Sequence, residues 1–177
     1  GGLSTVTIYK DQITSVEPED AARAVPKGET VIDGQGGTLV PGLHDMHSHT
    51  TLQSNLFNLA AGVTAVRDQG NYNEELLGWI DGLETGKLAG PRIVRNGFLE
   101  GRSPYSARHG FIADSLEGAL KDVRWYADHG YWQIKIYHSM NPDWVAPIAA
   151  EAHRLGMGGT GHVPAFSSPD RVLREGY

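Results

Sequence analysis

The sequence of 177 residues contains no cysteine. Disulfides and thiolate metal ligands are therefore excluded, so any metal ion would be bound through nitrogen and oxygen atoms. No apolar run reaches the length that a bilayer-spanning helix needs. The 15 lysine and arginine residues nowhere form a cluster interleaved with aromatic side chains, and the formal net charge is −6. We therefore expect neither a membrane nor a nucleic acid as a partner.

The chain also lacks an initiating methionine and a recognisable signal peptide. We interpret the N-terminus as processed or trimmed, so an export signal is not excluded. A share of 40% hydrophobic and 20% charged residues is typical of a globular chain that buries a core. We expect a soluble protein and favour the cytoplasm as its compartment.

Residues 1–38 contain three short apolar segments, at 6–9, 13–16 and 30–32. Lys-Asp, Glu-Pro-Glu-Asp and Asp-Gly-Gln-Gly-Gly sequences, which are typical of turns, separate and follow them. This pattern predicts the strands of a small antiparallel β unit, which would be the first domain.

From residue 39 onwards, apolar strands alternate with segments of helical character. The expected strands cover residues 39–49, 62–68, 92–96, 132–137 and 157–162. This alternation predicts an α/β fold with a parallel sheet, most often a (β/α)₈ barrel with its site at the carboxyl ends of the strands. A complete barrel needs about 250 residues, so the second domain, residues 39–177, has room for about five of the eight units. Such an open sheet would expose its inner face and two edges, which predicts self-association.

N-cap residues predict where the helices begin. Asn73 is expected to cap the second helix, and Asp114 with Glu117 three residues later forms a capping box for the third. The expected helices cover residues 53–61, 73–85, 114–130, 141–156 and 168–176.

The first strand of the repeat carries Asp45, His47 and His49 at every second position. Residues two apart on a strand share a face, so both imidazoles project together from the strand end. Two neutral imidazoles so placed can bind zinc or a similar ion; the alternative is a pair of surface histidines. Asp45 either orients a ligand imidazole by a hydrogen bond or is a satisfied core carboxylate.

The strand at 132–137 places Lys135 and Tyr137 on the face that the histidines share. An ammonium group repels a metal ion, so Lys135 must be deprotonated, paired with a carboxylate or converted by CO₂ to a carbamate. The alternative of a lysine that pairs with an acidic neighbour or extends to the rim stays open. His138 is expected to point away from Tyr137.

Two interpretations stay open for each of four further residues. His162 follows a glycine-rich strand and is either a ligand or a structural residue. The expected polar loop covers residues 100–110, and within it Arg108 and His109 either contact a substrate carboxylate or belong to a solvated loop. Asp68, beside Arg67, either orients the metal ligands or forms a structural ion pair.

Taken together, these motifs resemble the amidohydrolase superfamily over the whole chain. VIDGQGGTLVPGLHDMHSH is similar to the family's entry from a small β-sandwich into the barrel. GVTAVRDQG, IKIY and GHVPAF are similar to its strands two, four and five. The text most resembles the binuclear subgroup with Xaa-Pro and Xaa-Arg dipeptidases, close to imidazolonepropionase-like members.

The resemblance implies a site with two metal ions, expected to be Zn²⁺. His47 and His49 would bind the first ion, carboxylated Lys135 would bridge the two, and His162 would bind the second. Tyr137 would polarise the substrate carbonyl. The family also places a histidine after strand six and a catalytic aspartate after strand eight, neither of which is in this sequence.

The function implied is hydrolysis of an amide or peptide bond, in a small molecule or dipeptide, by a hydroxide that bridges the metals. One alternative is a non-catalytic half-barrel that self-associates. Another is a mononuclear hydrolase of a cyclic amide or lactone.

Overall fold

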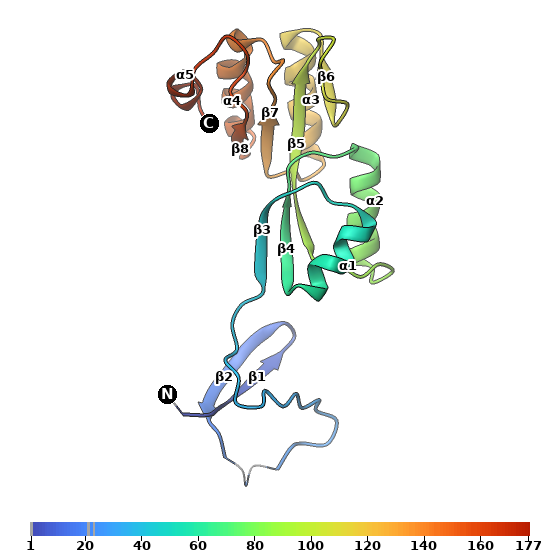
Figure 1. The fold of residues 1–177 in the computed structure, drawn as a ribbon, viewed down its shortest axis with the longest axis vertical. Coiled ribbons are helices and arrows are strands. Elements are labelled where there is room, and N and C mark those ends of the chain that lie inside the picture. Colours follow the sequence, from blue (N-terminus) through green and yellow to red (C-terminus); the bar gives the residue numbers. More distant parts are fainter. Residues whose placement is uncertain (1, 21, 23) are drawn as a thin grey trace. The chain divides into compact units, whose positions relative to one another are not determined.

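The computed structural model describes residues 2–20, 22 and 24–177, and the chain divides into two compact units, residues 1–41 and 42–177. Within the described ranges, no helix is both long and apolar enough to span a bilayer. Figure 1 shows the elements of each unit.

The first unit is a β-hairpin followed by irregular chain. Strands β1 (Ser4–Tyr9) and β2 (Gln12–Pro18) pair in antiparallel register, with Val6 opposite Val16. Lys10 and Asp11 form the turn with φ of 48° and 64°, the left-handed conformation that matches the twist of a two-residue hairpin. Both strands were expected from their alternating apolar residues.

The prediction of a third strand in this unit is wrong. Residues 30–32 form no strand, and Ile32 is 88% exposed. The chain instead turns directly afterwards, because the Asp33 carboxylate accepts the N–H of Gln35 at 2.8 Å and Gly37 donates its N–H to the Gly34 carbonyl. A strand needs a neighbour for its ladder, and in the described part of this unit residues 30–32 have none.

The second unit is built on a parallel sheet in the order β3-β4-β5-β7-β8 (Figure 1). These strands are β3 (Leu43–Ser48), β4 (Val63–Asp68), β5 (Arg92–Gly101), β7 (Gln133–Ile136) and β8 (Gly158–Gly161). The curled sheet has sequential strands as neighbours, with helices in the connections. This sheet confirms the predicted α/β fold, which is part of a (β/α)₈ barrel. The small antiparallel sheet of the first unit is present in addition.

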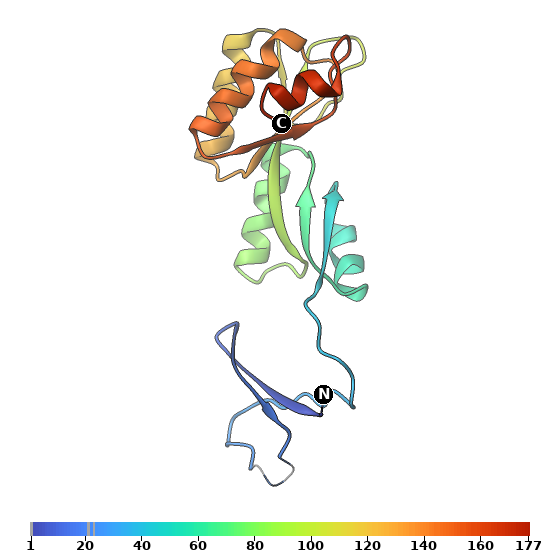
Figure 2. The same ribbon diagram turned by 90° about the vertical axis from the view of Figure 1, so that its left-hand side faces the viewer.

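Strand β5 is longer than expected and connects the two halves of the sheet. Its first half, from Arg92 to Arg95, pairs with β4, and its second half, from Asn96 to Leu99, pairs with β7 (Figure 2). Its last residues also pair with β6 (Phe111–Ala113), a short strand that was not expected. The sequence beyond Asn96 contains two glycines and a glutamate, which disguise its strand character.

The helices are α1 (Leu52–Ala60), α2 (Asn73–Glu84), α3 (Leu116–Asp128), α4 (Val145–Arg154) and α5 (Pro169–Arg174). A 3₁₀ turn at Pro142–Trp144 precedes α4. The expected helices are all present, with two corrections at their starts. Asn73 is the first residue of α2 rather than its cap, which is Tyr72.

The other correction concerns the start of α3. Its cap is Ser115, whose hydroxyl accepts the N–H of Gly118 at 3.1 Å. Asp114 instead forms an ion pair with Arg102. Ser115 directly follows Asp114 in the sequence, and the Asp114 carboxylate is engaged by Arg102, which leaves the cap to Ser115.

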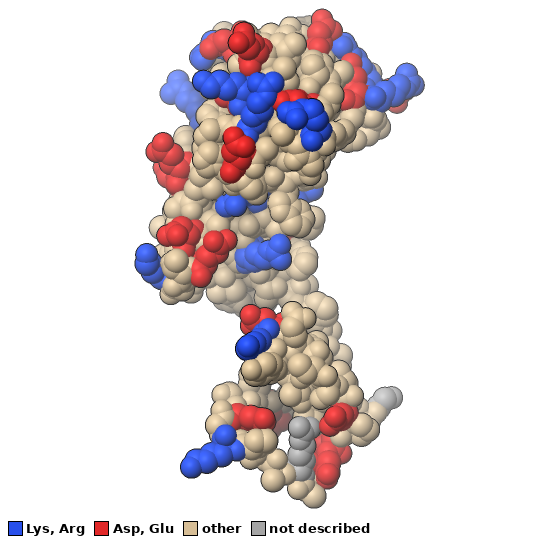
Figure 3. Space-filling model, turned by 180° about the vertical axis from the view of Figure 1, so that it is seen from behind, with Lys and Arg blue, Asp and Glu red and all other residues tan. Residues whose placement is uncertain are grey.

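Apolar side chains between the sheet and helices α3 and α4 form the core. Leu99, Val123, Tyr126 and Ile148 are fully buried there. The Tyr126 hydroxyl donates to the Phe98 carbonyl at 2.7 Å, which satisfies its only polar atom without solvent. Figure 3 shows basic and acidic side chains interspersed on one outer face. The carboxylate of Glu151, on α4, accepts hydrogen bonds from both Arg124 and Arg154 at 2.7 Å.

The core prediction concerns Ile148, which is 0% exposed on α4. We expect Ile148→Ala to lower the free energy of unfolding by about 2–5 kcal/mol, because it removes buried methyl groups and leaves a cavity. Urea unfolding followed by circular dichroism measures the change. The exposed variant Lys121→Ala serves as a control, with an expected change of about 0.5 kcal/mol or less. An equal, small effect of both substitutions would contradict this packing.

Candidate functional site

The candidate site lies at the carboxyl ends of the parallel strands. His47 and His49 stand at the end of β3, Lys135 lies on β7, and His162 directly follows β8. In the sheet register Lys135 pairs with Phe98 of β5 and Thr160 of β8, so neighbouring strands hold it on both sides. Its amine lies 5.7 Å from the Phe98 ring centre and 5.5 Å from that of Tyr137.

The imidazoles near this lysine form two separate groups. The ring centres of His47 and His49 are 5.6 Å apart. The His162 ring is tilted against that of Tyr137, with their centres 4.2 Å apart. In the described ranges, no three histidine or acidic side chains lie close enough together to hold a metal ion by themselves. The structure thus brings the expected ligands to one rim, and their role in metal binding stays a prediction.

The electrostatics of this rim favour uncharged nitrogen groups. Desolvation lowers the pKa of His47 and of His162, and the positive charge of Lys135 lowers both further. Desolvation also lowers the pKa of Lys135, with the Arg67 charge acting in the same direction and Asp68 opposing it. Neutral imidazole is the form that binds metals, and a neutral amine is the form that reacts with CO₂. The chemistry of this donor set therefore fits a zinc site with nitrogen and oxygen ligands.

Lys135 is 3% exposed, yet no ion pair or hydrogen bond of its amine is present in the described part of the chain. Burying an unpaired ammonium group is costly, and the cost is relieved when the group loses its proton. This environment distinguishes Lys135 from a lysine that merely extends to the solvent.

The orientation of His49 is set by a backbone carbonyl. Its Nδ1 lies 2.7 Å from the Gly70 carbonyl oxygen, which can only accept, so Nδ1 carries a proton and Nε2 is the nitrogen that would offer a lone pair to a metal ion. Asp68 in turn accepts from the N–H of Gly70 at 2.9 Å and of Thr50 at 2.8 Å. Asp68 thus orients a candidate ligand through the backbone of the turn.

Asp45 and Arg67 do not take the roles considered for them as partners of these groups. The Asp45 carboxylate accepts the backbone N–H of His47 at 3.0 Å, so it does not orient the His49 ring. Arg67 donates to the Met46 carbonyl at 2.9 Å and to the Gln133 side chain at 3.2 Å. A structural ion pair between Arg67 and Asp68 is therefore wrong, because adjacent residues of a strand point to opposite faces.

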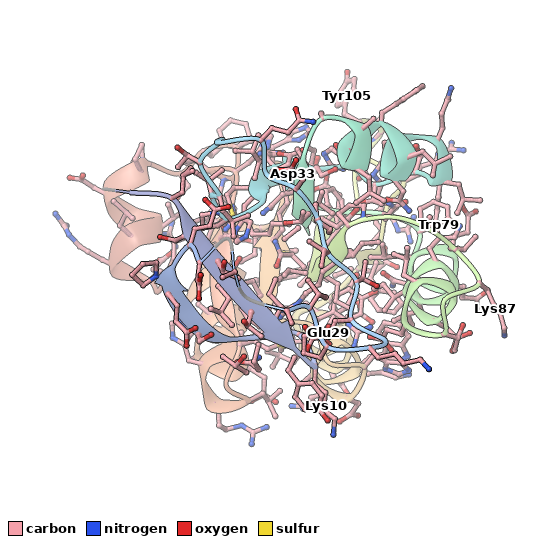
Figure 4. All side chains as sticks on the ribbon, turned by 90° about the horizontal axis from the view of Figure 1, so that it is seen from below. Lys10, Glu29, Asp33, Trp79, Lys87 and Tyr105 are labelled. Atoms are coloured by element: carbon pink, nitrogen blue, oxygen red, sulfur yellow. The ribbon has the colours of Figure 1, made fainter. Side chains whose placement is uncertain are left out.

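Of the two loop residues expected to contact substrate, the structure brings only His109 to the rim. Its ring lies 5.9 Å from that of His49 and 5.9 Å from that of Phe98. Desolvation and the nearby His49 lower its pKa. Arg108 is exposed, and Tyr105 in the same loop is 83% exposed and projects outward from the ribbon (Figure 4).

Two features near the site were missed or misjudged from the sequence. His138 does not point away from Tyr137, because the two rings are 4.9 Å apart. Glu100 is fully buried at the end of β5 and was read only as the start of a polar loop. Its only sequence signal is a charged residue directly after the apolar Phe98 and Leu99.

No family model and no curated protein matches the sequence. Solved structures do match. A candidate prolidase from Bifidobacterium longum is 24% identical, with a TM-score of 0.76 over 97% of this chain and 46% of that one. A Xaa-Pro dipeptidase with methionine bound in its active site is 19% identical, with a TM-score of 0.71 over 92% of this chain and 52% of that one.

A bottromycin amidohydrolase is 24% identical, with a TM-score of 0.67 over 76% of this chain and 31% of that one. This chain shares the fold of these three proteins. The predicted family resemblance is thus confirmed at the level of fold. The chain spans about half, or less, of the length of each of these structures.

The prediction from this geometry concerns Asp68. We expect Asp68→Asn to lower the free energy of unfolding by about 1.5–3 kcal/mol, because an amide cannot accept the N–H groups of Gly70 and Thr50 with both of its terminal atoms. Urea unfolding measures this effect. Asp81→Asn on the exposed face of α2 is the matched control, and equal stability of the two variants would argue against the described turn.

Proposed function

We propose that this chain provides the metal-binding part of a metal-dependent amidohydrolase that cleaves an amide or peptide bond in a small substrate such as a dipeptide. One observation carries the proposal: the buried amine of Lys135 has no counter-ion in the described part of the chain and lies at the rim where His47, His49 and His162 gather. The names of the structures that share the fold, an amidohydrolase and two peptidases, support this reaction class.

In this proposal His47 and His49 would hold one ion, His162 would hold another, and carboxylated Lys135 would supply oxygen ligands. Zinc suits these ligands, since the chain offers imidazole and oxygen donors but no thiolate. When bound, the ions supply Lewis acidity and lower the pKa of a water molecule to about 7.

Carboxylation of Lys135 is a reaction of its neutral amine. The lone pair of Nζ attacks the carbon of CO₂, an N–C bond forms, and one C=O electron pair moves onto oxygen. The amine proton leaves to solvent, and the product is a carbamate anion with two oxygen donors. The low-polarity position between Phe98 and Tyr137, which lowers the lysine pKa, favours the amine that this step needs.

Tyr137 and His109 provide the contacts with substrate in this proposal. The Tyr137 hydroxyl would donate a hydrogen bond to the carbonyl oxygen as negative charge develops there. His109, beside His49, would contact the carboxylate end of a peptide, with the exposed Arg108 at the outer edge of the same loop.

Zinc content tests the metal proposal. We expect the full chain, incubated with zinc and bicarbonate, to retain zinc after desalting, and Lys135→Ala to lose at least half of it, as measured by mass spectrometry of the metal. Lys121→Ala, an exposed lysine, should retain the wild-type amount. With ¹³C-bicarbonate, the wild type should show a carbamate carbon resonance that Lys135→Ala lacks. Unchanged zinc content and no carbamate resonance would refute the proposal.

Dipeptide hydrolysis tests the role of Tyr137. In a protein that joins this chain to the histidine and catalytic aspartate expected after strands six and eight, we expect Tyr137→Phe to lower kcat by about 100-fold or more with little change in KM, because the hydrogen bond acts mainly on the developing oxyanion. Steady-state kinetics on a panel of dipeptides measures both constants. An equal kcat for the phenylalanine variant would remove Tyr137 from the mechanism.

The alternative of a self-associating half-barrel is supported by helix α1. This helix buries the polar Asn55, whereas Leu52, Leu56 and Phe57 are 48%, 57% and 65% exposed. An apolar helix face in water favours association. Sedimentation velocity should then show a dimer or larger species that Leu56→Glu converts to monomer, and a wild-type monomer that binds zinc would count against this alternative.

A further inference from the structure

The carboxylate of Glu100 is completely buried, and the proposed reaction does not use it. It accepts backbone N–H groups from three residues. Its Oε1 accepts from Gly101 at 3.0 Å and from Ser139 at 2.9 Å, and its Oε2 accepts from Ala107 at 3.3 Å. One side chain is thus bonded to three points of the backbone.

These three points lie in one strand and two loops. Gly101 ends β5, Ala107 lies in the middle of the loop after β5, and Ser139 lies in the loop after β7. The hydroxyls of Ser103 and Ser139 join the same loops at 2.9 Å. The two loops are therefore fastened together at the rim, with Glu100 at the centre of the contact.

Backbone N–H groups supply the hydrogen bonds to the Glu100 carboxylate, and His138 is an ionisable neighbour, with Nδ1 3.9 Å from Oε2. In the described ranges no lysine or arginine forms an ion pair with Glu100. Removing a carboxylate from water is costly. Hydrogen bonds from three N–H groups offset this cost only while both loops keep their positions.

The loop that Glu100 fastens carries His109 to the site. Beyond Ala107 the chain is fixed again at Gly110, whose N–H donates to the Asn71 carbonyl at 2.9 Å. Arg108 and His109 lie between these two fixed points. The backbone is therefore held on both sides of His109, and the His109 ring lies against those of His49 and Phe98. On the other loop, Ser139 follows Tyr137 by two residues.

We propose that Glu100 is a positioning residue whose carboxylate fastens the loop after β5 to the loop after β7 and thereby sets His109 and Tyr137 at one rim. The functional meaning of these two side chains rests on the proposed amidohydrolase function. The fastening itself does not, so it can be tested separately.

Amide hydrogen exchange, measured by NMR on the full chain, tests the fastening. In the wild type the amides of Ala107 and Ser139 should exchange at least tenfold more slowly than that of the exposed Arg108, whose N–H has no hydrogen-bond partner in the described part of the chain. In Glu100→Gln, the side-chain NH₂ group faces a backbone donor, so protection of Ala107 should fall at least tenfold. The His109 ring resonances should also lose the shifts caused by Phe98 and Tyr72. Amides of Ile134 and Ile136 in β7 should stay protected.

Glu117→Gln, the same substitution at an exposed position of α3, is the control and should leave all these signals unchanged. Rapid exchange of Ala107 and Ser139 in the wild type would overturn the proposal, even if the glutamine variant failed to fold. Unchanged His109 resonances in a folded Glu100→Gln variant would overturn it as well.

Kinetics link the fastening to function. If Glu100 acts through His109, then Glu100→Gln and His109→Asn should each raise KM for dipeptides at least tenfold, and the double variant should be no worse than His109→Asn alone. Additive effects would overturn the link to His109. Hydrolysis also needs the aspartate that the resemblance places after strand eight, so an absence of hydrolysis in every variant, the wild type included, would leave the decision on Glu100 to the exchange experiment.

Discussion

The structure of the second unit depends on the parallel pairing of β5 with different strands along its length. Its first half pairs with β4 and its second half with β7. Strand β5 therefore joins the β3-β4 part of the sheet to the β7-β8 part. Because all these strands are parallel, their carboxyl ends meet at one rim. Phe98, paired with Lys135, and Glu100, which fastens two loops, both lie on the second half of β5. The site is therefore a direct consequence of this one strand.

The rim combines basic groups of lowered pKa with buried carboxylates that bond to backbone. His47, His162 and Lys135 are all shifted towards their neutral forms. Asp68 and Glu100 accept backbone N–H groups and shape turns, and the charge of Asp68 opposes the lowering of the Lys135 pKa without reversing it. Such a rim has nitrogen lone pairs for a cation and little negative charge of its own. A carbamate on Lys135 would supply the missing anionic oxygens, which is why the proposed function depends on that residue.

The hairpin and helix α1 are two elements of the described chain that expose large apolar side chains. In the hairpin, Ile8, Ile13 and Val16 are all more than 60% exposed. In α1 the buried residue is Asn55, whose amide atoms have no hydrogen-bond partner in the described part of the chain. Both features fit a chain that spans about half of the structures that share its fold. A two-stranded sheet and an apolar helix face are stable when something covers them.

The sequence by itself determined the β/α alternation, the pair of histidines and the strand that carries Lys135 and Tyr137, because these depend on local periodicity and on caps. It failed for residues 30–32, where an apolar segment had no strand to pair with, and at Asp114, where an ion pair with Arg102 left the cap to Ser115. Only the tertiary structure decided that His109 joins the rim, that Gly70 orients His49 and that Glu100 fastens two loops. These contacts join residues that are distant in sequence or pass through backbone atoms, which have no side-chain pattern to reveal them.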